Sequence, residues 1–597
     1  RAGMLSAVIT LAPAIGCDLG TQPPVDPEAG IERRVSDLLE QMTLAEKIGQ
    51  MTQAERSALA GDEDIRIYAL GSILSGGGSS PPDNSPGGWA EMVDRFQAQA
   101  LQTRRKIPLL YGVDAVHGHN HVRGAVIFPH NIGLGCTRNP ALVEAAARVT
   151  AREVAATGVD WTFSPCIAVP RDERWGRTYE GFGETPELAH MMAAAAVRGY
   201  QGIVPGGAES VLACAKHFVG DGGTTGGIDQ GNTEVDELTL RALHLAGYAS
   251  AIEAGVMSIM VSFSSWNGQK MHGHSYLLTH VLKGELGFKG FLVSDWGGID
   301  QLPGDFSDDV ETSINAGLDM IMVPYRYREF ISTLHALVER GHVPVERIDD
   351  AVRRILRVKV RLGLFERPYA DRTLLSTVGS DAHRAVAREC VRQSIVVLKN
   401  AGNVLPLRSN VQRIHVAGKS ADDLGVQCGG WTITWQGSTG AITDGTTILQ
   451  ALRQAVGSGT TVTYSRDGFG AAGAEAGIVV IGETPYAEGY GDRENLHLAT
   501  EDVAALARVK GAGVPTVAVL ISGRPMIIES LLGACDAFVA AWLPGTEGAG
   551  VADVLFGTYH PTGKLSHTWP RYMGQIPINI GDALYDPLFP YGFGLSY

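Results

Sequence analysis

Residues 290–296 read Gly-Phe-Leu-Val-Ser-Asp-Trp, and this stretch decides the fold. A short apolar run bounded by glycines is typical of a buried parallel strand that ends in a loop. In a barrel of parallel strands, catalytic groups lie at the carboxyl ends of the strands. Asp295 and Trp296 therefore stand where a nucleophilic carboxylate and a flat platform for a ring could be held. The alternative is that Asp295 only caps a turn, because Asp is common in turns.

Similar β-branched runs alternate with Ala-rich helical segments on both sides of this stretch. They begin at Gly71, Ile107, Val159, Val211, Ser258 and Leu318. This alternation predicts an α/β fold, a (β/α)8-type barrel over residues 31–364. We expect the Gly- and Pro-rich segment 76–88 to be a loop between two such units that forms a solvent-facing lid or rim.

A second group of strand-like runs follows a linker at residues 365–380. These runs begin at Ile395, Ile414, Gly477, Pro515 and Ala537, and they also alternate with helical segments. The pattern predicts an α/β sandwich domain with a largely parallel sheet over residues 381–597.

The composition narrows the classes of ligand. The 597 residues include 49 Lys and Arg against 64 Asp and Glu, which gives a net charge of −15. This balance argues against a nucleic-acid partner and favours a protein that handles neutral ligands. Apart from Cys17, the cysteines are scattered and form no CxxC motif, so they indicate neither a metal site nor a disulfide framework. We expect no metal and no organic cofactor.

The first 30 residues have the pattern of a leader and a linker. Met4 to Gly16 form a short apolar run behind Arg1, and Cys17 and a polar segment follow. The pattern resembles a truncated bacterial secretory signal with a lipoprotein-type cysteine, and it is too short to span a bilayer comfortably. Because the usual Leu three residues before the cysteine is missing, lipidation of Cys17 and plain signal cleavage stay equal alternatives. We expect an exported protein that is periplasmic, anchored through Cys17, or secreted without an anchor.

Polar and aromatic residues recur where the predicted barrel strands end. In chain order they are Asp114, Arg171, Asp172, Arg174, Arg177, Lys216, His217, Ser264, Ser265, Trp266, Asp295 and Trp296. One such residue is more often part of a solvated rim, but this succession favours a pocket at the open end of the barrel.

Two segments of the second domain contain residues suited to binding a sugar or to catalysis. The Gly-rich segment 428–437 contains Trp431 and Trp435, which we expect to be exposed and to bind the apolar face of a sugar; anchoring a domain interface is the alternative. The segment 484–495 follows a predicted strand that ends at Glu483, and it offers the further acidic residues Glu488, Asp492 and Glu494 on a Gly-containing loop. An acid on such a loop could close over Asp295. Two carboxyl groups that flank one bond are what glycoside hydrolysis requires.

The chain resembles the two-domain β-glucosidases and β-glucan exohydrolases of glycoside hydrolase family 3, from about Ile31 to Tyr597. The resemblance rests on YGVDAVHG (111–118), RDERWGRTYEGFGE (171–184), AKHFVGDGG (215–223), MVSFSSWNG (260–268), GFLVSDW (290–296), CGGWTITWQG (428–437), GETPYAEGYGD (482–492) and FPYGFGLSY (589–597). Eight motifs in this order are highly specific.

The resemblance implies a retaining mechanism, with Asp295 as the nucleophile and Glu488 as the acid/base. Glu483 is the rival in the same loop, but its place at the strand end favours a role in supporting the turn. The implied first sugar subsite consists of Asp114, Arg177, Lys216, His217, Met260 and Phe263, and Phe263 stands where the family often has tyrosine. Trp296 and Trp435 match the pair that holds the next sugar. Arg177 and Lys216 should help to keep Asp295 ionised.

The implied activity is removal of glucose from the non-reducing ends of β-glucans and their oligosaccharides. The same scaffold also carries β-xylosidase and N-acetyl-β-glucosaminidase activities. A hexosaminidase is disfavoured because the chain keeps Glu488 and has Asp221 in the turn after Lys216 and His217. The non-enzymatic alternative is a surface lipoprotein that binds oligosaccharides. The presence of both Asp295 and Glu488 argues against it.

Overall fold

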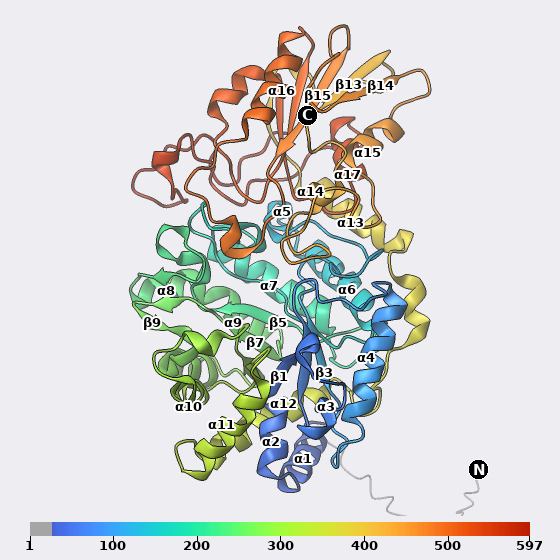
Figure 1. Ribbon diagram of the computed structural model, residues 1–597. Coiled ribbons are helices and arrows are strands. Elements are labelled where there is room, and N and C mark those ends of the chain that lie inside the picture. Colours follow the sequence, from blue (N-terminus) through green and yellow to red (C-terminus); the bar gives the residue numbers. More distant parts are fainter. Residues whose placement is uncertain (1–26) are drawn as a thin grey trace, which may run out of the picture.

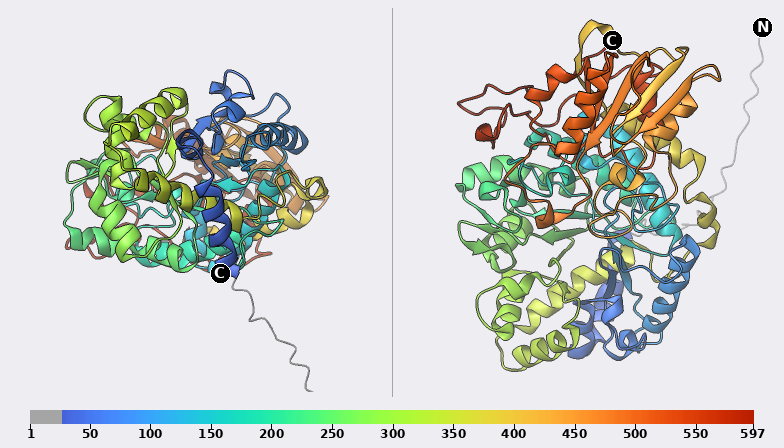
Figure 2. Two further views of the ribbon diagram at one scale, coloured as in Figure 1. Left: turned by 90° about the horizontal axis from the view of Figure 1, so that it is seen from below. Right: turned by 45° about the horizontal axis from the view of Figure 1, so that its top comes forward.

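The computed structural model describes residues 27–597. A barrel, coloured blue to yellow along the chain, carries a C-terminal domain, coloured orange to red, on one of its ends (Figure 1). The tilted view on the right of Figure 2 shows the same stacking. Cys17 and the other residues from 1 to 26 of the predicted leader and linker lie outside the described residues. The last four residues of that predicted segment are helical and not linker, because α1 begins at Pro27. No helix within residues 27–597 is long and apolar enough to cross a membrane.

Eight short parallel strands form the barrel in the described part of the chain. They are β1 (Thr52–Glu55), β2 (Ser72–Ser75), β3 (Leu110–Val113), β4 (Trp161–Thr162), β5 (Cys214–Phe218), β7 (Ser258–Val261), β10 (Phe291–Val293) and β11 (Ile321–Met322). They pair in the orders β11-β1-β2-β3-β4 and β10-β7-β5. Parallel bridges between Trp161 and Leu212 and between Val293 and Met320 join the two sheets, so the strands close into the predicted barrel.

Helices surround the strands and lead into the C-terminal domain. They are α1 (Pro27–Glu40), α2 (Leu44–Gln50), α3 (Asp64–Ile67), α4 (Pro86–Ala100), α5 (Asn131–Thr137), α6 (Pro140–Ala156), α7 (Pro186–Gln201), α8 (Glu237–His244), α9 (Ala246–Glu253), the π-helix Tyr276–Glu285, α10 (Phe306–Ala316), α11 (Tyr327–Glu339), α12 (Val345–Arg361) and α13 (Asp381–Ser394). Local sequence sets many helix starts. At α2, for example, Thr43 and Glu46 form a reciprocal capping box.

Strand β1 is the barrel strand that the sequence pattern did not reveal. Its residues Thr52, Gln53, Ala54 and Glu55 are all buried although three of them are polar. Gln53 donates a hydrogen bond of 2.8 Å to the Ser72 hydroxyl on β2, which compensates for its burial. An inward row of polar residues leaves no apolar run, so periodicity cannot identify this strand.

The C-terminal domain is an α/β sandwich, as predicted from the sequence. Its strands are β12 (Val396–Asn400), β13 (Arg413–Ala417), β14 (Thr461–Ser465), β15 (Ala476–Gly482), β16 (Thr516–Ile521) and β17 (Ala537–Trp542), and its helices are α14 (Leu424–Cys428), α15 (Ile448–Ala455), α16 (Thr500–Gly511) and α17 (Ala549–Leu555). The sheet order is β12-β17-β16-β15-β13-β14, and β12 is antiparallel to β17 while the other pairs are parallel. Helix α16 lies on one side of the sheet and α15 and α17 lie on the other (Figure 1).

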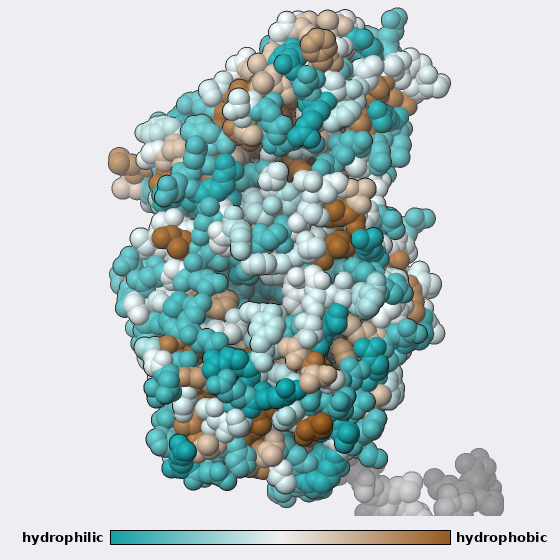
Figure 3. All heavy atoms as spheres, in the orientation of Figure 1, coloured by the Kyte–Doolittle hydropathy of each residue, from teal (hydrophilic) through white to brown (hydrophobic). Residues whose placement is uncertain are grey.

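Two further features complete the fold. Short strands β6 (Asn232–Thr233), β8 (Ser265–Trp266) and β9 (Gln269–Lys270) form a small sheet beside the barrel. The barrel and the C-terminal domain each have a large cluster of buried apolar residues. The face in Figure 3 is mostly hydrophilic, with hydrophobic residues scattered in small spots.

Candidate active site

The barrel and two loops of the C-terminal domain enclose a cavity of about 520 Å³. The residues lining it include Glu55, Gly76, Gly77, Phe163, Gln230, Gln301, Met322, Tyr325 and Trp431. They also include all ten candidate site residues from the sequence, namely Asp114, Arg177, Lys216, His217, Met260, Phe263, Asp295, Trp296, Trp435 and Glu488. The structure therefore brings the candidate residues together in one cavity.

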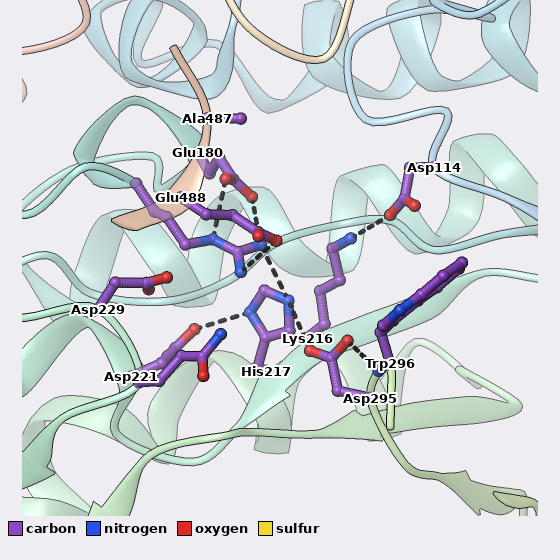
Figure 4. Close-up of polar contacts among 12 residues, drawn as sticks. Asp114, Glu180, Lys216, His217, Asp221, Asp229, Asp295, Trp296, Ala487 and Glu488 are labelled. Carbon is purple, nitrogen blue, oxygen red and sulfur yellow. Dashed lines mark hydrogen bonds and ion pairs between the residues drawn. The ribbon is translucent and has the colours of Figure 1, made fainter. Parts of the chain in front are cut away.

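Two domains supply the carboxyl groups of this cavity. Asp295 follows the carboxyl end of β10 by two residues, where the apolar strand gives way to a loop. Glu488 begins a 3-10 turn, Glu488–Gly491, that follows β15 in the C-terminal domain. In Figure 4, Ala487 and Glu488 come from the C-terminal segment above the site, while Asp295 comes from the barrel below.

Asp295 is partly buried, with 13 % of its side chain exposed, and both cations and carboxylates surround it. The Trp296 backbone N–H donates a 2.7 Å hydrogen bond to Asp295 Oδ1, and His217 Nε2 lies 3.7 Å from Oδ2. Burial raises the pKa of Asp295 to about 6, although the nearby charges of Arg177 and Lys216 lower it. The two cations act in the expected direction, but desolvation has the larger effect.

Glu488 is the candidate acid, and its pKa is higher than that of Asp295. The Arg177 Nη1 donates a 3.2 Å hydrogen bond to Glu488 Oε1. Burial raises the pKa of Glu488 to about 8, because the carboxylates of Asp295 and Asp229 add to desolvation while Arg177 opposes them. Glu488 is therefore mainly protonated at neutral pH.

A buried ion pair holds Arg177 in place. Its guanidinium donates two parallel hydrogen bonds to the Glu180 carboxylate, at 2.9 and 2.8 Å. The Trp431 indole N–H donates to the same carboxylate at 3.1 Å. The expectation that Trp431 is exposed is therefore wrong, because only 5 % of it is exposed and its ring lies at the junction of the two domains.

Lys216 and His217 have fixed partners at the end of β5. Lys216 Nζ donates a 2.7 Å hydrogen bond to Asp114 Oδ1. His217 Nδ1 lies 2.8 Å from Asp221 Oδ2, and its Nε2 lies 3.1 Å from Arg177 Nη2. Since the guanidinium can only donate, the histidine carries its proton on Nδ1. Burial and the neighbouring Arg177 hold the pKa of His217 well below its usual value, so the ring is neutral.

Trp296 and Trp435 line the cavity, and exposed tyrosines contact both. Tyr325 stands edge-on to Trp296 at 5.7 Å, and Tyr490 stands edge-on to Trp435 at 5.4 Å between ring centroids. The segment 76–88 begins at the cavity, which Gly76 and Gly77 line; Gly77 is exposed and Gly76 is buried. Its last three residues are helical and not a loop, because α4 begins at Pro86.

Glu483, the rival acid, supports the loop that carries Glu488. Its carboxylate accepts hydrogen bonds from the Tyr486 hydroxyl at 2.9 Å and from the Gly523 backbone N–H at 3.1 Å. It also pairs with Arg524 at 3.3 Å. These contacts occupy its oxygens below the loop, and Glu483 is not among the residues that line the cavity.

One cluster within residues 27–597 has the spacing of metal ligands. The candidate atoms of Cys166, His217 and Asp221 lie within 4.8 Å of one another. However, His217 and Asp221 already bond to each other, and burial raises the pKa of the Cys166 thiol, which opposes the thiolate that metals prefer. This arrangement is better suited to orienting His217 than to binding an ion.

Sequence reasoning missed some residues of the site. Glu180 was not singled out, although it lies three residues after Arg177 in the same motif and has the opposite charge. Met322 and Tyr325 also line the cavity, at and just beyond the end of β11. The rule that sites lie at the carboxyl ends of barrel strands could have found them, since this strand was predicted.

Comparison with known families agrees with the architecture. A family model described as the glycosyl hydrolase family 3 N terminal domain matches residues 43–358, and the C-terminal domain model of the same family matches residues 395–597. The chain belongs to glycosyl hydrolase family 3. As a member of this family, it is a glycoside hydrolase.

Individual relatives of this family 3 enzyme cover nearly the whole chain. It is 36 % identical to a lysosomal β-glucosidase of Dictyostelium discoideum, over 94 % of this chain and 76 % of the relative. It is 32 % identical to a periplasmic β-glucosidase of Salmonella typhimurium, over 99 % and 83 %. The crystal structure of an exo-1,3/1,4-β-glucanase from a Pseudoalteromonas species superposes with a TM-score of 0.91 at 43 % identity, over 96 % of this chain and 75 % of the other.

Proposed function

We propose that the chain is a retaining, exo-acting β-glucosidase that releases glucose from the non-reducing ends of β-glucans and their oligosaccharides. One observation supports the mechanism most directly: Asp295 from the barrel and Glu488 from the C-terminal domain line the same cavity, with a pKa of about 6 for Asp295 and about 8 for Glu488. Near neutral pH the first is mainly ionised and the second mainly protonated. This combination suits a nucleophile and a general acid.

The proposed reaction is a double displacement. The Asp295 carboxylate attacks the anomeric carbon while Glu488 donates its proton to the departing glycosidic oxygen, which leaves a glucosyl ester on Asp295. The Glu488 carboxylate then removes a proton from water, and the water attacks the same carbon. Glucose leaves with its β configuration, and the reaction requires no cofactor.

The remaining lining residues suit a sugar. Asp114 can accept hydrogen bonds from neighbouring hydroxyls, while Lys216 and Arg177 donate and His217 offers a further polar contact. Met260 and Phe263 supply apolar lining in the first subsite. We assign Trp296 and Trp435 to the next sugar, because indole faces pack well against pyranose C–H groups.

The names of the relatives support glucose as the released sugar. They are two β-glucosidases and an exo-1,3/1,4-β-glucanase, and they match 94 % or more of this chain. They favour this reading over the xylosidase, hexosaminidase and binding-protein alternatives. We infer that β-1,3- and β-1,4-linked glucosides are both substrates.

We also propose that the protein is exported, which is compatible with the relative described as periplasmic. Lipidation of Cys17 and cleavage without a lipid remain the two forms of this proposal. Expression of wild type and Cys17→Ala with a full leader, followed by membrane fractionation, separates them. Loss of membrane association only in the variant supports the anchor, and unchanged distribution overturns it.

The deciding experiment is time-resolved proton NMR with cellotriose and laminaritriose. We expect β-glucose to appear before mutarotation produces the α anomer. Asp295→Asn should lower turnover on the order of 10⁴-fold or more. Release of α-glucose first would overturn the double displacement, and hydrolysis of β-xylosides in preference to β-glucosides would overturn the glucose assignment.

Glu488→Gln tests the acid/base assignment with a different signature. Its turnover of glucosides with poor leaving groups should fall by about 10²- to 10⁴-fold. Activated aryl glucosides should be far less affected in the first step, and azide should restore turnover by replacing water. Equal inactivity on all substrates, without azide rescue, would contradict this role.

A further inference from the structure

Asp492 connects the loop of Glu488 to the barrel. It lies four residues after Glu488 in the C-terminal domain, and its carboxylate accepts two backbone hydrogen bonds from barrel residues. Gly176 N–H donates to Oδ1 at 2.8 Å, and Asp229 N–H donates to Oδ2 at 2.8 Å. Both oxygens of one side chain thus bridge two separate barrel segments. Hydrogen bonds to a carboxylate are short and strong in comparison with neutral ones.

We propose that Asp492 is a positioning residue that holds the Glu488 carboxyl group in its place above the barrel. The inference rests on the proposed acid/base function of Glu488 and adds a second residue on which that function depends. Asp492 is not among the residues that line the cavity. It acts through the backbone of the loop and makes no contact with substrate.

The backbone packing shows how closely the loop and the barrel are matched. A Cβ atom added to Gly176 would lie 2.0 Å from the Glu488 carbonyl oxygen and 2.8 Å from the Asp492 backbone nitrogen. No side chain therefore fits between the barrel backbone at residue 176 and the loop. This close contact fixes the position of the Glu488 main chain, and the hydrogen bonds of Asp492 hold the loop against the barrel at the same place.

The conformation of Glu488 itself needs external support. Its φ is +54°, in the left-handed region that residues other than glycine rarely adopt. Such a conformation persists where the surrounding structure fixes it, and it is found mainly at functional sites. The Asp492 backbone N–H donates a 3.2 Å hydrogen bond to the Gly489 carbonyl and closes the turn, while its side chain fastens that turn to the barrel.

The two bridged amides belong to segments of the site. Gly176 precedes Arg177, whose guanidinium donates to Glu488. Asp229 precedes Gln230, which lines the cavity, and its side chain accepts a 3.0 Å hydrogen bond from the Trp175 indole. Figure 4 shows Asp229 on the same side of the site as Glu488. The bridge therefore fixes the acid relative to the groups that set its ionisation.

The test compares Asp492→Ala, Asp492→Asn and the matched control Glu494→Gln in the full chain. Glu494 is an exposed carboxylate in the same loop. We expect Asp492→Ala to lower kcat/KM for aryl β-glucosides with poor leaving groups by about 10- to 100-fold. For 2,4-dinitrophenyl β-glucoside the fall should be less than about threefold, and azide should raise kcat. Asp492→Asn keeps one acceptor oxygen and should lie between Asp492→Ala and wild type, while Glu494→Gln should match wild type.

Each outcome separates this inference from the proposed function. An equal loss on all leaving groups, without azide rescue, would show that Asp492 only stabilises the fold and would overturn the inference, as would wild-type behaviour of Asp492→Ala. If Glu488→Gln shows the acid/base signature in the same assays while Asp492→Ala does not, only this inference fails. If Glu488→Gln lacks that signature, both the proposed acid/base function of Glu488 and the inference about Asp492 fail.

Discussion

Asp295 and Glu488 carry the same functional group, but their surroundings give them different pKa values of about 6 and about 8. Below about pH 6 the nucleophile is protonated, and above about pH 8 the acid has lost its proton. We therefore predict a bell-shaped dependence of kcat/KM on pH with a maximum near pH 7. Measurements with an aryl β-glucoside check this. Glu488→Gln should lose the alkaline limb and keep the acid limb, and an alkaline limb that persists in this variant would contradict the assignment.

The raised pKa of Glu488 also has a consequence for stability. Its carboxyl group has a pKa of about 8 in the folded protein against an ordinary value of 4.5, so the unfolded chain releases the proton more readily. The resulting destabilisation is absent below about pH 4.5 and grows as pH rises towards 8. Glu488→Gln should remove it and stabilise the fold by about 3 kcal/mol at pH 7.

Thermal unfolding of wild type and Glu488→Gln checks this prediction. The increase in Tm should be largest at about pH 8 and above, and it should vanish below about pH 4, where the wild-type group is neutral in both the folded and the unfolded protein. A pH-independent difference in Tm would show that packing, and not ionisation, separates the two proteins. The expected result would also indicate that the carboxyl group needed for activity lowers the stability of the folded protein.

At the scale of an element, the loop after β2 sets the position of a cavity wall. A Cβ atom at Gly76 would lie 2.5 Å from Cη2 and Cζ3 of the Trp296 indole, so Gly76→Ala must displace that ring. We predict that KM for laminaribiose rises about tenfold, which corresponds to about 1.4 kcal/mol of lost binding. The KM for β-glucosyl fluoride, which has no second sugar, should change little.

Gly87→Ala is the matched control for Gly76→Ala. A Cβ atom there would have only the Ser85 hydroxyl nearby, at 3.8 Å, so alanine fits without displacement. Its kinetics should equal those of wild type on both substrates. Equal increases in KM for laminaribiose and β-glucosyl fluoride in Gly76→Ala would contradict a role of Trp296 in holding the second sugar.

At the scale of the whole molecule, Arg524 ties the two domains together. Its side chain is fully buried and donates hydrogen bonds to the Arg174 carbonyl of the barrel at 2.9 Å and to the Gly491 carbonyl at 2.6 Å. It also neutralises the buried Glu483 at 3.3 Å. Arg524→Met should destabilise the fold by about 3–5 kcal/mol, because it removes a fully buried cation from the Glu483 carboxylate and leaves the Gly491 carbonyl without its side-chain donor.

A lower Tm and a loss of activity should appear together in Arg524→Met, since the loop of Glu488 depends on the same contacts. Arg571→Met serves as the control, because Arg571 pairs with Glu529 at 2.9 Å on the surface. Such an exposed pair contributes little to stability, because water and salt screen it. An unchanged Tm in Arg524→Met would contradict its assigned place at the junction.

The strands show how far sequence periodicity reaches. Strands such as β7 and β10 are apolar and buried, so their runs are visible in the sequence. The sequence pattern does not predict strand β1, because its buried side chains are mostly polar. It does not predict the edge strand β14 either, because none of the residues of β14 is buried. Both strands were missed for the same reason: the sequence pattern reveals a strand only where a whole face of apolar side chains is buried, and neither β1 nor β14 has such a face.

The sequence by itself determined the α/β class, the two-domain arrangement and the candidate residues, because apolar runs, strand-end chemistry and eight ordered motifs are properties of the chain. Only the tertiary structure decided that Trp431 is buried, that residue 76 packs against Trp296, and that Asp492 bridges to the barrel at Gly176. These contacts join segments far apart in the chain. Such proximity depends on how the closed barrel and the sandwich domain pack together, and the local conformational propensities of the sequence cannot predict it.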